Sequence, residues 1–302
     1  MSRELKAMRD VMIEGIHRKM KQDERILFMA ADFGSPQLDK LRSEFPDRFL
    51  NVGIAEQNLV NLAAGAALEG FTVYAYALAP FLTMRAFEQI RNNLALLSHG
   101  REVNVNLIGV GAGLSYDVSG PTHHCLEDLS VIRTLPGIEV ISPSDWRLVE
   151  KLVDHSVAVK KPKYFRFDGK PLPPLAAEVD DQTIKQGFRV LKKGQDLCLV
   201  ATGYLTHQAL AAAAKLAGAG REIGVIDLFM FRPFDRAALR QSLRGYKNII
   251  TIEEAFIGKG GLDSLIAGVL REDKGGTHLD SIGFDDEYVF EVGDRASLLA
   301  RL

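Results

Sequence analysis

Cysteine is scarce in this sequence, and long apolar runs are absent from it. Cys125 and Cys198 lie far apart and have no metal-ligand spacing around them. We therefore expect neither a structural disulfide nor a cysteine-bound metal, and a reducing cytoplasm is the natural compartment. No stretch is apolar over the length of a bilayer crossing, and the charged start of the chain does not resemble a cleavable signal.

An excess of charge of either sign is also lacking. Lys and Arg number 37 and Asp and Glu number 39, which gives a net charge of -2. Nucleic acids and anionic membranes attract strongly basic surfaces, so we expect neither as a partner. A chain of 302 residues with 47% hydrophobic residues is long enough to form two globular domains.

Short apolar stretches alternate with amphipathic ones along the whole chain, and this alternation is typical of parallel sheets covered by helices. We predict an α/β fold of two domains, each a mostly parallel sheet flanked by helices. The first covers residues 1–170, a linker covers 171–186, and the second covers 187–302. The segment 168–186 is rich in Pro and charge and has no clear periodicity, which indicates a linker.

The expected elements follow from the same alternation. In the first domain we expect a long helix through residues 85–98, and in the second we expect helices over 206–217, from Asp235 and after Gly261. The expected strands are 26–31, 71–77, 103–110, 138–142, 163–167, 196–202, 222–228 and 248–254.

Three alternating glycines, Gly109, Gly111 and Gly113, follow one of the expected strands and suggest a dinucleotide fingerprint. That fingerprint requires a helix to begin there, with its N-terminus directed at a pyrophosphate. Polar and aromatic residues follow instead, so we do not predict a nucleotide site at this loop.

The most informative segment is residues 51–70, NVGIAEQNLVNLAAGAALEG, which places Glu56 at the start of an apolar helix. An acid is common in the first turn of any helix, where it interacts favourably with the dipole. A buried carboxylate, however, needs a partner for its charge or its proton. Both explanations are consistent with this segment alone.

Further motifs follow in a fixed order. DFGS stands at residues 32–35, followed by PFLTMRAFEQIRN, GPTHHCLED and SPSDW, and then by LVATGYLTHQAL, VIDLFMFRPFD and TIEEAFIGKGG. This ordered set resembles the C-terminal half of the transketolase family, a group of thiamine-diphosphate enzymes, and the resemblance extends to the deoxyxylulose-phosphate synthases. It covers nearly the whole chain and implies a pyrimidine-binding domain followed by a transketolase C-terminal domain.

The resemblance implies that the cofactor is thiamine diphosphate. Its aminopyrimidine removes the thiazolium proton when a carboxyl group is bonded to the opposite ring nitrogen, while the protein supplies position and electrostatics. Glu56 matches that catalytic carboxyl group. Phe81 matches the aromatic residue that stacks on the pyrimidine, and Ile54 is the third residue implied to bind the cofactor.

The resemblance also implies substrate contacts. His123 of GPTHH matches a catalytic histidine that reaches a substrate hydroxyl, a role that suits a side chain titrating near neutral pH. Arg166 matches an arginine that holds a sugar phosphate, although a structural pair with Asp168 is an equal alternative. Asp32 and Ser35 are candidates for lining the substrate channel.

Three positions depart from the family pattern. Ser119 precedes the GPTH motif where an acidic residue usually reads a sugar hydroxyl, so the substrate could differ from the standard pentose phosphates. Gly111 replaces a phosphate-side histidine of many transketolases. His124 replaces a usual Gln, so no role carries over to it.

The largest departure is the absence of a GDG motif anywhere in the chain. In the family this motif binds the diphosphate through a divalent cation, Mg²⁺ or alternatively Ca²⁺ or Mn²⁺, which takes oxygen ligands. We therefore expect no metal ligands in this chain. A separate N-terminal transketolase-like subunit would carry the motif, and the two chains would form an α₂β₂ heterotetramer with the active site at their interface.

The leading hypothesis is the C-terminal subunit of a split transketolase. It would transfer a two-carbon ketol unit from a sugar phosphate ketose to an aldose, and only with its partner. The first alternative is a pyruvate-using enzyme, either a deoxyxylulose-phosphate-synthase-like enzyme or a 2-oxoacid dehydrogenase β subunit. The second is a non-catalytic scaffold that has kept the fold. The second domain is expected to give dimerisation and support.

Overall fold

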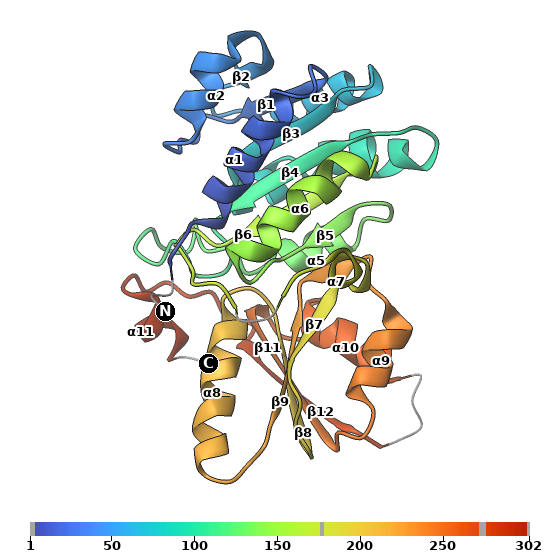
Figure 1. The fold of residues 1–302 in the computed structure, drawn as a ribbon. Coiled ribbons are helices and arrows are strands. Elements are labelled where there is room, and N and C mark those ends of the chain that lie inside the picture. The colour runs from blue at the N-terminus through green and yellow to red at the C-terminus, as the bar shows by residue number, and fades with distance from the viewer. Residues whose placement is uncertain (1–3, 176–177, 272–275, 301–302) are drawn as a thin grey trace.

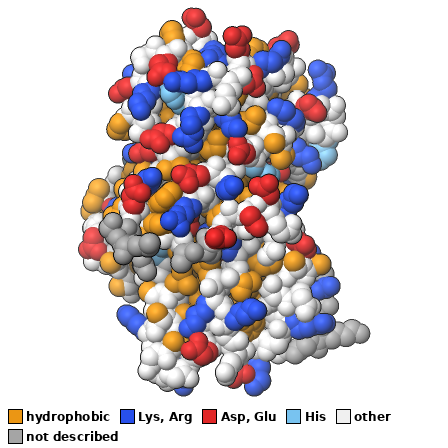
Figure 2. All heavy atoms as spheres, in the orientation of Figure 1, with side chains coloured by type: hydrophobic (Ala, Val, Ile, Leu, Met, Phe, Trp, Pro, Cys, Tyr) orange, Lys and Arg blue, Asp and Glu red, His pale blue; other side chains and the backbone are white. Residues whose placement is uncertain are grey.

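The computed structural model describes residues 4–175, 178–271 and 276–300. Within them the chain forms two sheets with helices packed on both, one in each half of the molecule (Figure 1). The predicted architecture of two mostly parallel α/β units is confirmed. Figure 2 shows acidic and basic side chains interspersed over the face in view, in keeping with the small net charge.

Within the described residues the first sheet has seven strands, in the order β10-β5-β6-β4-β3-β1-β2. Every neighbouring pair is parallel except β10 with β5. The central strands are mostly apolar and are buried on both faces, as is typical of parallel sheets. The strands that the N-terminal half supplies are β1 Ile26–Ala30, β2 Phe49–Asn51, β3 Thr72–Leu78, β4 Val105–Val110, β5 Glu139–Ile141 and β6 Lys163–Phe167.

Helices cover this sheet on both faces. They are α1 Met8–Met20, α2 Leu38–Glu44, the 3₁₀ turn η1 Pro46–Arg48, α3 Glu56–Leu68, α5 Asp128–Arg133 and α6 Trp146–Ala158. Between β3 and β4 we expected one long helix over 85–98, and the chain is helical over nearly all of this stretch but does not form one regular α-helix. The chain forms instead a π-helix η2 Phe81–Arg85, α4 Phe87–Ile90, a second π-helix η3 Arg91–Leu96 and a 3₁₀ turn η4 Leu97–His99.

The second sheet has five strands among the described residues, in the order β12-β11-β8-β9-β7. Only the edge strand β7 runs antiparallel to its neighbour. The strands are β7 Phe188–Lys192, β8 Leu197–Ala201, β9 Gly224–Leu228, β11 Asn248–Phe256 and β12 His278–Phe284. The helices are α8 Leu205–Gly218, α9 Arg236–Leu243, α10 Leu262–Leu270 and α11 Arg295–Leu299.

The two halves are joined by more than the covalent connection. Strand β10 Met230–Arg232 lies in the second half of the sequence but pairs with β5 of the first sheet. The expected linker is partly ordered, since α7 Asp181–Gln186 begins with a capping box formed by Asp180 and Thr183. Residues 176–177 lie outside the described residues. None of the helices that the structure describes combines the length and apolarity needed to cross a membrane.

Candidate functional site

Glu56 is the first residue of α3, and its side chain is almost completely buried. The loop before it carries Gly53 at φ 75°, a conformation that glycine adopts without strain, and this turn delivers the chain into the helix. Nη1 of Arg85 donates a hydrogen bond to Oε2 of Glu56 at 2.5 Å. A buried carboxylate of this kind needs such a partner, and Arg85 supplies it from the end of the first π-helix.

Side chains from two further segments, the first π-helix and the GPTHH loop, meet next to Glu56. The Arg85 guanidinium lies over the Phe81 ring, 4.8 Å from its centroid. The Phe81 ring in turn meets the edge of the His123 ring, with centroids 5.3 Å apart and an interplanar angle of 73°. Nδ1 of His123 lies 3.0 Å from the Thr122 hydroxyl. The fold thus brings together the three residues that the motifs singled out: Glu56, Phe81 and His123.

An open, mostly apolar pocket of about 520 Å³ lies against this group. One side comes from the π-helix and another from the GPTHH loop, while a third comes from the C-terminal half of the chain. Burial lowers the pKa of the His124 imidazole in its wall, which favours the neutral ring. The lining residues are Pro80, Phe81, Met84, Arg85, Pro121, Thr122, His124, Glu127, Tyr288 and Phe290.

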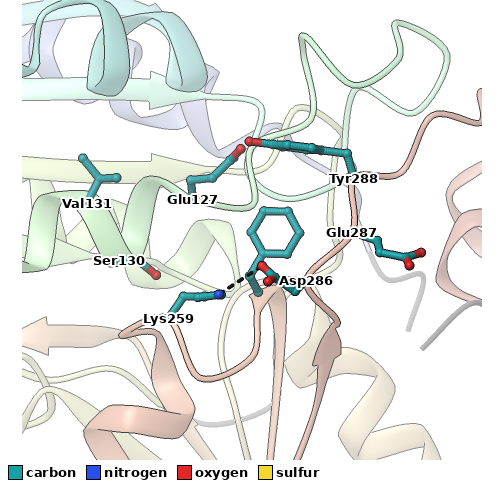
Figure 3. Close-up of a pocket in the computed structure, with 8 residues that line it drawn as sticks. Glu127, Ser130, Val131, Lys259, Asp286, Glu287 and Tyr288 are labelled. Carbon is teal, nitrogen blue, oxygen red and sulfur yellow. Dashed lines mark ion pairs between the residues drawn. The ribbon is translucent and has the colours of Figure 1, made fainter.

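A second, smaller pocket of about 290 Å³ shares Glu127 and Tyr288 with the first. Figure 3 shows the Tyr288 hydroxyl directed toward the Glu127 carboxyl group, and an ion pair of 3.0 Å between Lys259 and Asp286 below it. Burial raises the pKa of Glu127, which is a further sign of an environment that disfavours charge. The pair of Glu127 and Tyr288 therefore separates two pockets at the junction of the two halves.

Arg166 is not placed to hold a substrate phosphate, and the prediction of that role was wrong. The side chain is buried, and its Nε donates to both oxygens of Asp128 at 3.0 and 2.9 Å. Its Nη2 donates to the carbonyl groups of Cys125 and Glu254. The alternative pair with Asp168 was also wrong, since Asp168 binds Arg295.

The remaining predicted substrate residues lie at different places. Asp32 is exposed after β1 with φ 47°, and both its backbone N–H and its carboxylate form hydrogen bonds with the Asn51 side chain. Ser35 is buried and donates to Asp10 at 2.8 Å. Ser119 is exposed in the loop before His123, and Ile54, with 76% of its surface accessible, is exposed before Glu56.

Sequence reasoning missed Arg85, Tyr288 and Phe290. Arg85 stands one turn after Phe81, and that spacing could have indicated a shared site. Tyr288 and Phe290 lie far from every motif, so no signal in the sequence connects them with the pocket. They show that the second domain, from which we expected dimerisation and support, also lines the pocket. Among the described residues, no group of three or more His, Cys, Asp or Glu side chains is arranged to hold a metal ion.

Each half of the chain matches a known family model. Residues 5–173 match the family model "Transketolase, pyrimidine binding domain", and residues 187–297 match "Transketolase, C-terminal domain". The chain belongs to the transketolase family. This transketolase chain is thereby a subunit of a thiamine-diphosphate-dependent transferase, as the motifs predicted.

Individual relatives of this transketolase chain are themselves transketolase subunits. An apulose-4-phosphate transketolase subunit of Actinobacillus succinogenes is 34% identical over 290 residues, which cover 96% of this chain and 91% of that protein. The 6-deoxy-6-sulfo-D-fructose transketolase subunit SqwH of a Clostridium species is 29% identical over 88% of this chain and 81% of that protein.

A solved structure described as a split gene transketolase, an inactive beta4 tetramer, has a TM-score of 0.80 and 31% identity. The match covers 93% of this chain and 89% of that chain. The predicted assignment, the C-terminal subunit of a split transketolase, is confirmed.

Proposed function

We propose that this chain forms half of a ketol-transfer site, which a diphosphate-binding partner completes across the face that carries Glu56 and His123. Residues 1–170 would form the cofactor-facing domain and residues 187–302 the second domain. The observation that carries the proposal is the contact series from Glu56 through Arg85 and Phe81 to His123. These side chains come from three segments and meet beside one open pocket.

Glu56 and Phe81 suit the pyrimidine end of thiamine diphosphate. A carboxyl group on the first turn of an apolar helix, with an aromatic ring beside it, offers a hydrogen-bonding group and a flat surface together. When bound, this cofactor supplies a carbon nucleophile that attacks a ketose carbonyl. Glu56 would hold the proton of the pyrimidine nitrogen, Phe81 would stack on the ring, and Ile54 would cover its edge.

His123 is suited to a substrate hydroxyl. Its Nδ1 contacts the Thr122 hydroxyl, which leaves Nε2 available on the other side of the ring. The edge contact with Phe81 fixes the plane of the imidazole. His123 would therefore orient a hydroxyl of the ketose and exchange its proton, as a general acid and base does. Ser119, a neutral residue of the same loop, would contact the sugar without supplying a charged hydrogen bond.

With Arg166 buried, another arginine must be considered for a substrate phosphate. Arg9 is half-buried on α1, its charge lies near the hydroxyl groups of Tyr76 and Tyr116, and its guanidinium lies 5.9 Å from the Phe33 centroid. This cluster, with Ser35 close by, surrounds the carboxyl ends of parallel strands, where α/β sheets bind ligands. We assign Arg9 and Ser35 to the phosphate end of the substrate, with Asp32 at the rim.

The diphosphate and its divalent cation would be held by the partner. The chain has no GDG motif, and no metal-binding cluster is found in the parts that the structure describes. Hard divalent cations take several oxygen ligands, so a second chain must provide them. An α₂β₂ assembly in the cytoplasm, with Mg²⁺ in the partner's site, is the simplest arrangement that meets this need.

The test is donor cleavage by the reconstituted pair. This chain and the GDG-containing subunit of the same genome are purified, mixed with Mg²⁺ and thiamine diphosphate, and offered xylulose 5-phosphate, fructose 6-phosphate, apulose 4-phosphate and pyruvate in parallel. Apulose 4-phosphate is included because a relative carries it in its name. Ketose cleavage that requires both chains is expected. Decarboxylation of pyruvate alone would refute ketol transfer.

Variants of this chain test which of its residues take part in catalysis and in phosphate binding. Glu56→Gln is expected to abolish cleavage while the pair still assembles, because Gln keeps the shape of the side chain but cannot share a proton in the same way. Arg9→Met should raise KM for phosphorylated donors, whereas Arg42→Met, at an exposed pair with Asp39, should not. Unchanged turnover in the Glu56 variant would remove the basis of the proposed site.

A further inference from the structure

The smaller of the two pockets between the halves of the chain is a candidate binding site in its own right, and we name it the junction pocket. Figure 3 shows side chains of both halves around this space. Its volume of about 290 Å³ corresponds to roughly ten water molecules at about 30 Å³ each, which is enough for a small organic molecule. The residues that line it are Glu127, Ser130 and Val131 from the first half, and Phe256, Lys259 and residues 286–288 from the second.

Aromatic side chains form the apolar part of the junction pocket. The rings of Phe256 and Tyr288 meet edge to face, with centroids 5.6 Å apart and an interplanar angle of 86°. Phe256 is itself buried in a small apolar cluster of the second half, which holds its ring in place. Val131 adds an aliphatic side chain from α5. A ligand with a flat apolar body would therefore meet a surface that is already formed.

The hydroxyl group of Ser130 is a polar group without a partner in the wall of this pocket. Its Oγ atom is buried and forms no hydrogen bond with any residue that the structure describes. Buried hydroxyl groups almost always have a hydrogen-bond partner, so this one needs an explanation. The two halves are in close contact beside it, since a Cβ atom built on Gly260 would be 3.9 Å from Ser130. A hydrogen-bonding ligand in the junction pocket would supply the missing partner.

The charged groups of the junction pocket are mostly acidic, since three carboxyl groups and one lysine line it. Lys259 forms an ion pair of 3.0 Å with Asp286 and so does not compensate the charge of Glu127. Within the described part of the chain Glu127 has no ion-pair partner, and it accepts a hydrogen bond of 3.0 Å from the backbone N–H of Leu126. Its negative charge raises the pKa of the Tyr288 hydroxyl, which is directed toward it (Figure 3). A positively charged group would supply the counter-charge that this half-buried carboxylate lacks.

We propose that the junction pocket binds a small aromatic amine. Glu127 and Ser130 stand three residues apart at the start of α5, so their side chains lie on the same face, and one ammonium group would donate to both. The aromatic body would lie against the rings of Phe256 and Tyr288. Glu127 and Tyr288 also line the larger pocket, so a bound amine would neutralise a carboxyl group in the wall of that pocket and connect the two halves of the chain.

The test uses three probes of similar shape and different charge: phenethylamine as the cation, phenethyl alcohol as the neutral probe and hydrocinnamate as the anion. Each is titrated into the purified full chain, and its dissociation constant is measured from NMR chemical shifts. The full chain alone is sufficient, so the result does not depend on whether the reconstituted pair cleaves a ketose.

Three variants identify the pocket that the probe occupies, and circular dichroism checks that each is folded. Glu127→Gln removes the charge and keeps the shape of the side chain. Val131→Phe fills the space, because Val131 lines the junction pocket and does not line the larger one. Glu287→Gln is the matched control, since it removes the same charge at an exposed residue whose carboxyl group points away from Glu127 (Figure 3).

We expect phenethylamine to bind the wild type at least about tenfold more tightly than the alcohol or the carboxylate, because hydrogen bonds between charged groups are the stronger ones. Glu127→Gln should remove most of this preference, and Val131→Phe should abolish binding. Glu287→Gln should change the affinity by less than about threefold, as for an exposed charge. The proposal would be overturned if the amine did not bind the wild type or if all three probes bound equally. Unchanged amine binding in both Glu127→Gln and Val131→Phe would also overturn it, since the amine would then occupy another site.

Discussion

Replacement of Asp128 by Asn is expected to destabilise the chain strongly. Asp128 is fully buried and accepts hydrogen bonds from Arg166 Nε and, at 2.6 Å, from the Tyr164 hydroxyl. Burial is the largest single influence and opposes the charge of Arg166, but the Asp128 carboxylate, Cys125 and Tyr164 together outweigh it and raise the pKa of the guanidinium. An asparagine side chain at this position would keep the shape and lose the charge, which leaves a buried cation without its counterion.

The size of this loss follows from the burial of both groups. Removing one partner of a buried ion pair costs about 3–5 kcal/mol. For a chain of this size each kcal/mol lowers the melting temperature by roughly 2–4 °C, so a decrease of about 6–20 °C is expected. Arg42→Met is the matched control, because the Arg42–Asp39 pair of 3.4 Å is exposed. Such surface pairs contribute about 1 kcal/mol or less.

Urea unfolding followed by circular dichroism, together with thermal melting, measures the change. Arg166→Met is measured alongside, since the structural role predicts destabilisation there too. The reasoning would be refuted if both variants kept wild-type stability while the Arg166 variant showed a raised KM for phosphorylated donors. That result would return Arg166 to the substrate site.

Three further changes have defined outcomes. Gly194→Ala should lower the unfolding free energy by about 2 kcal/mol or more in urea, because its Cβ would overlap the backbone nitrogen of Gly224; wild-type stability would contradict this. Burial raises the pKa of the Cys198 thiol to about 12 and that of Cys125 well above its usual value. Neither thiol should therefore react with a thiol reagent until the chain unfolds, and rapid labelling of the native chain would contradict this. Burial also raises the pKa of Glu253 from 4.5 to about 7. The folded state then binds the extra proton, so this residue's contribution to stability should fall as pH rises from about 4.5 to 7. In the Glu253→Gln variant the urea midpoint should decrease less between pH 4.5 and 7 than in the wild type. An equal decrease in both proteins would contradict the role given to Glu253.

The central strands could be predicted from the sequence because they are buried on both faces and therefore appear as continuous apolar runs. Strand β10 is only three residues long and ends in an Arg, and its partner β5 lies far away in the sequence, so only the packing of the two halves pairs them. The spacing of apolar residues over 85–98 does not indicate that this helical stretch contains π-helices. The helix α7 lies in the segment that was predicted to be a linker because of its Pro and charge content. Its capping box could have been recognised from the sequence.

Within the site, Glu56, Phe81 and His123 were predictable because each belongs to a local motif. Arg166 was misassigned because the residue that buries it, Asp128, belongs to a different motif, and no local pattern shows that the two meet. The same limit explains why Phe290 was missed. The spacing of residues within a motif cannot predict which side chains from distant segments contribute to the same site.

The C-terminal segment and the loop that leads to His123 keep their relative positions because Arg295 binds both of them. Its guanidinium is buried and binds both Glu254 of β11 and Asp168 after β6. Its backbone N–H donates to Asp117, the residue directly before Val118. One residue thus ties the C-terminal segment that carries Phe290 to the loop that leads to His123. A pocket whose walls are held in place before a ligand binds loses little conformational freedom on binding, and this preorganisation favours binding.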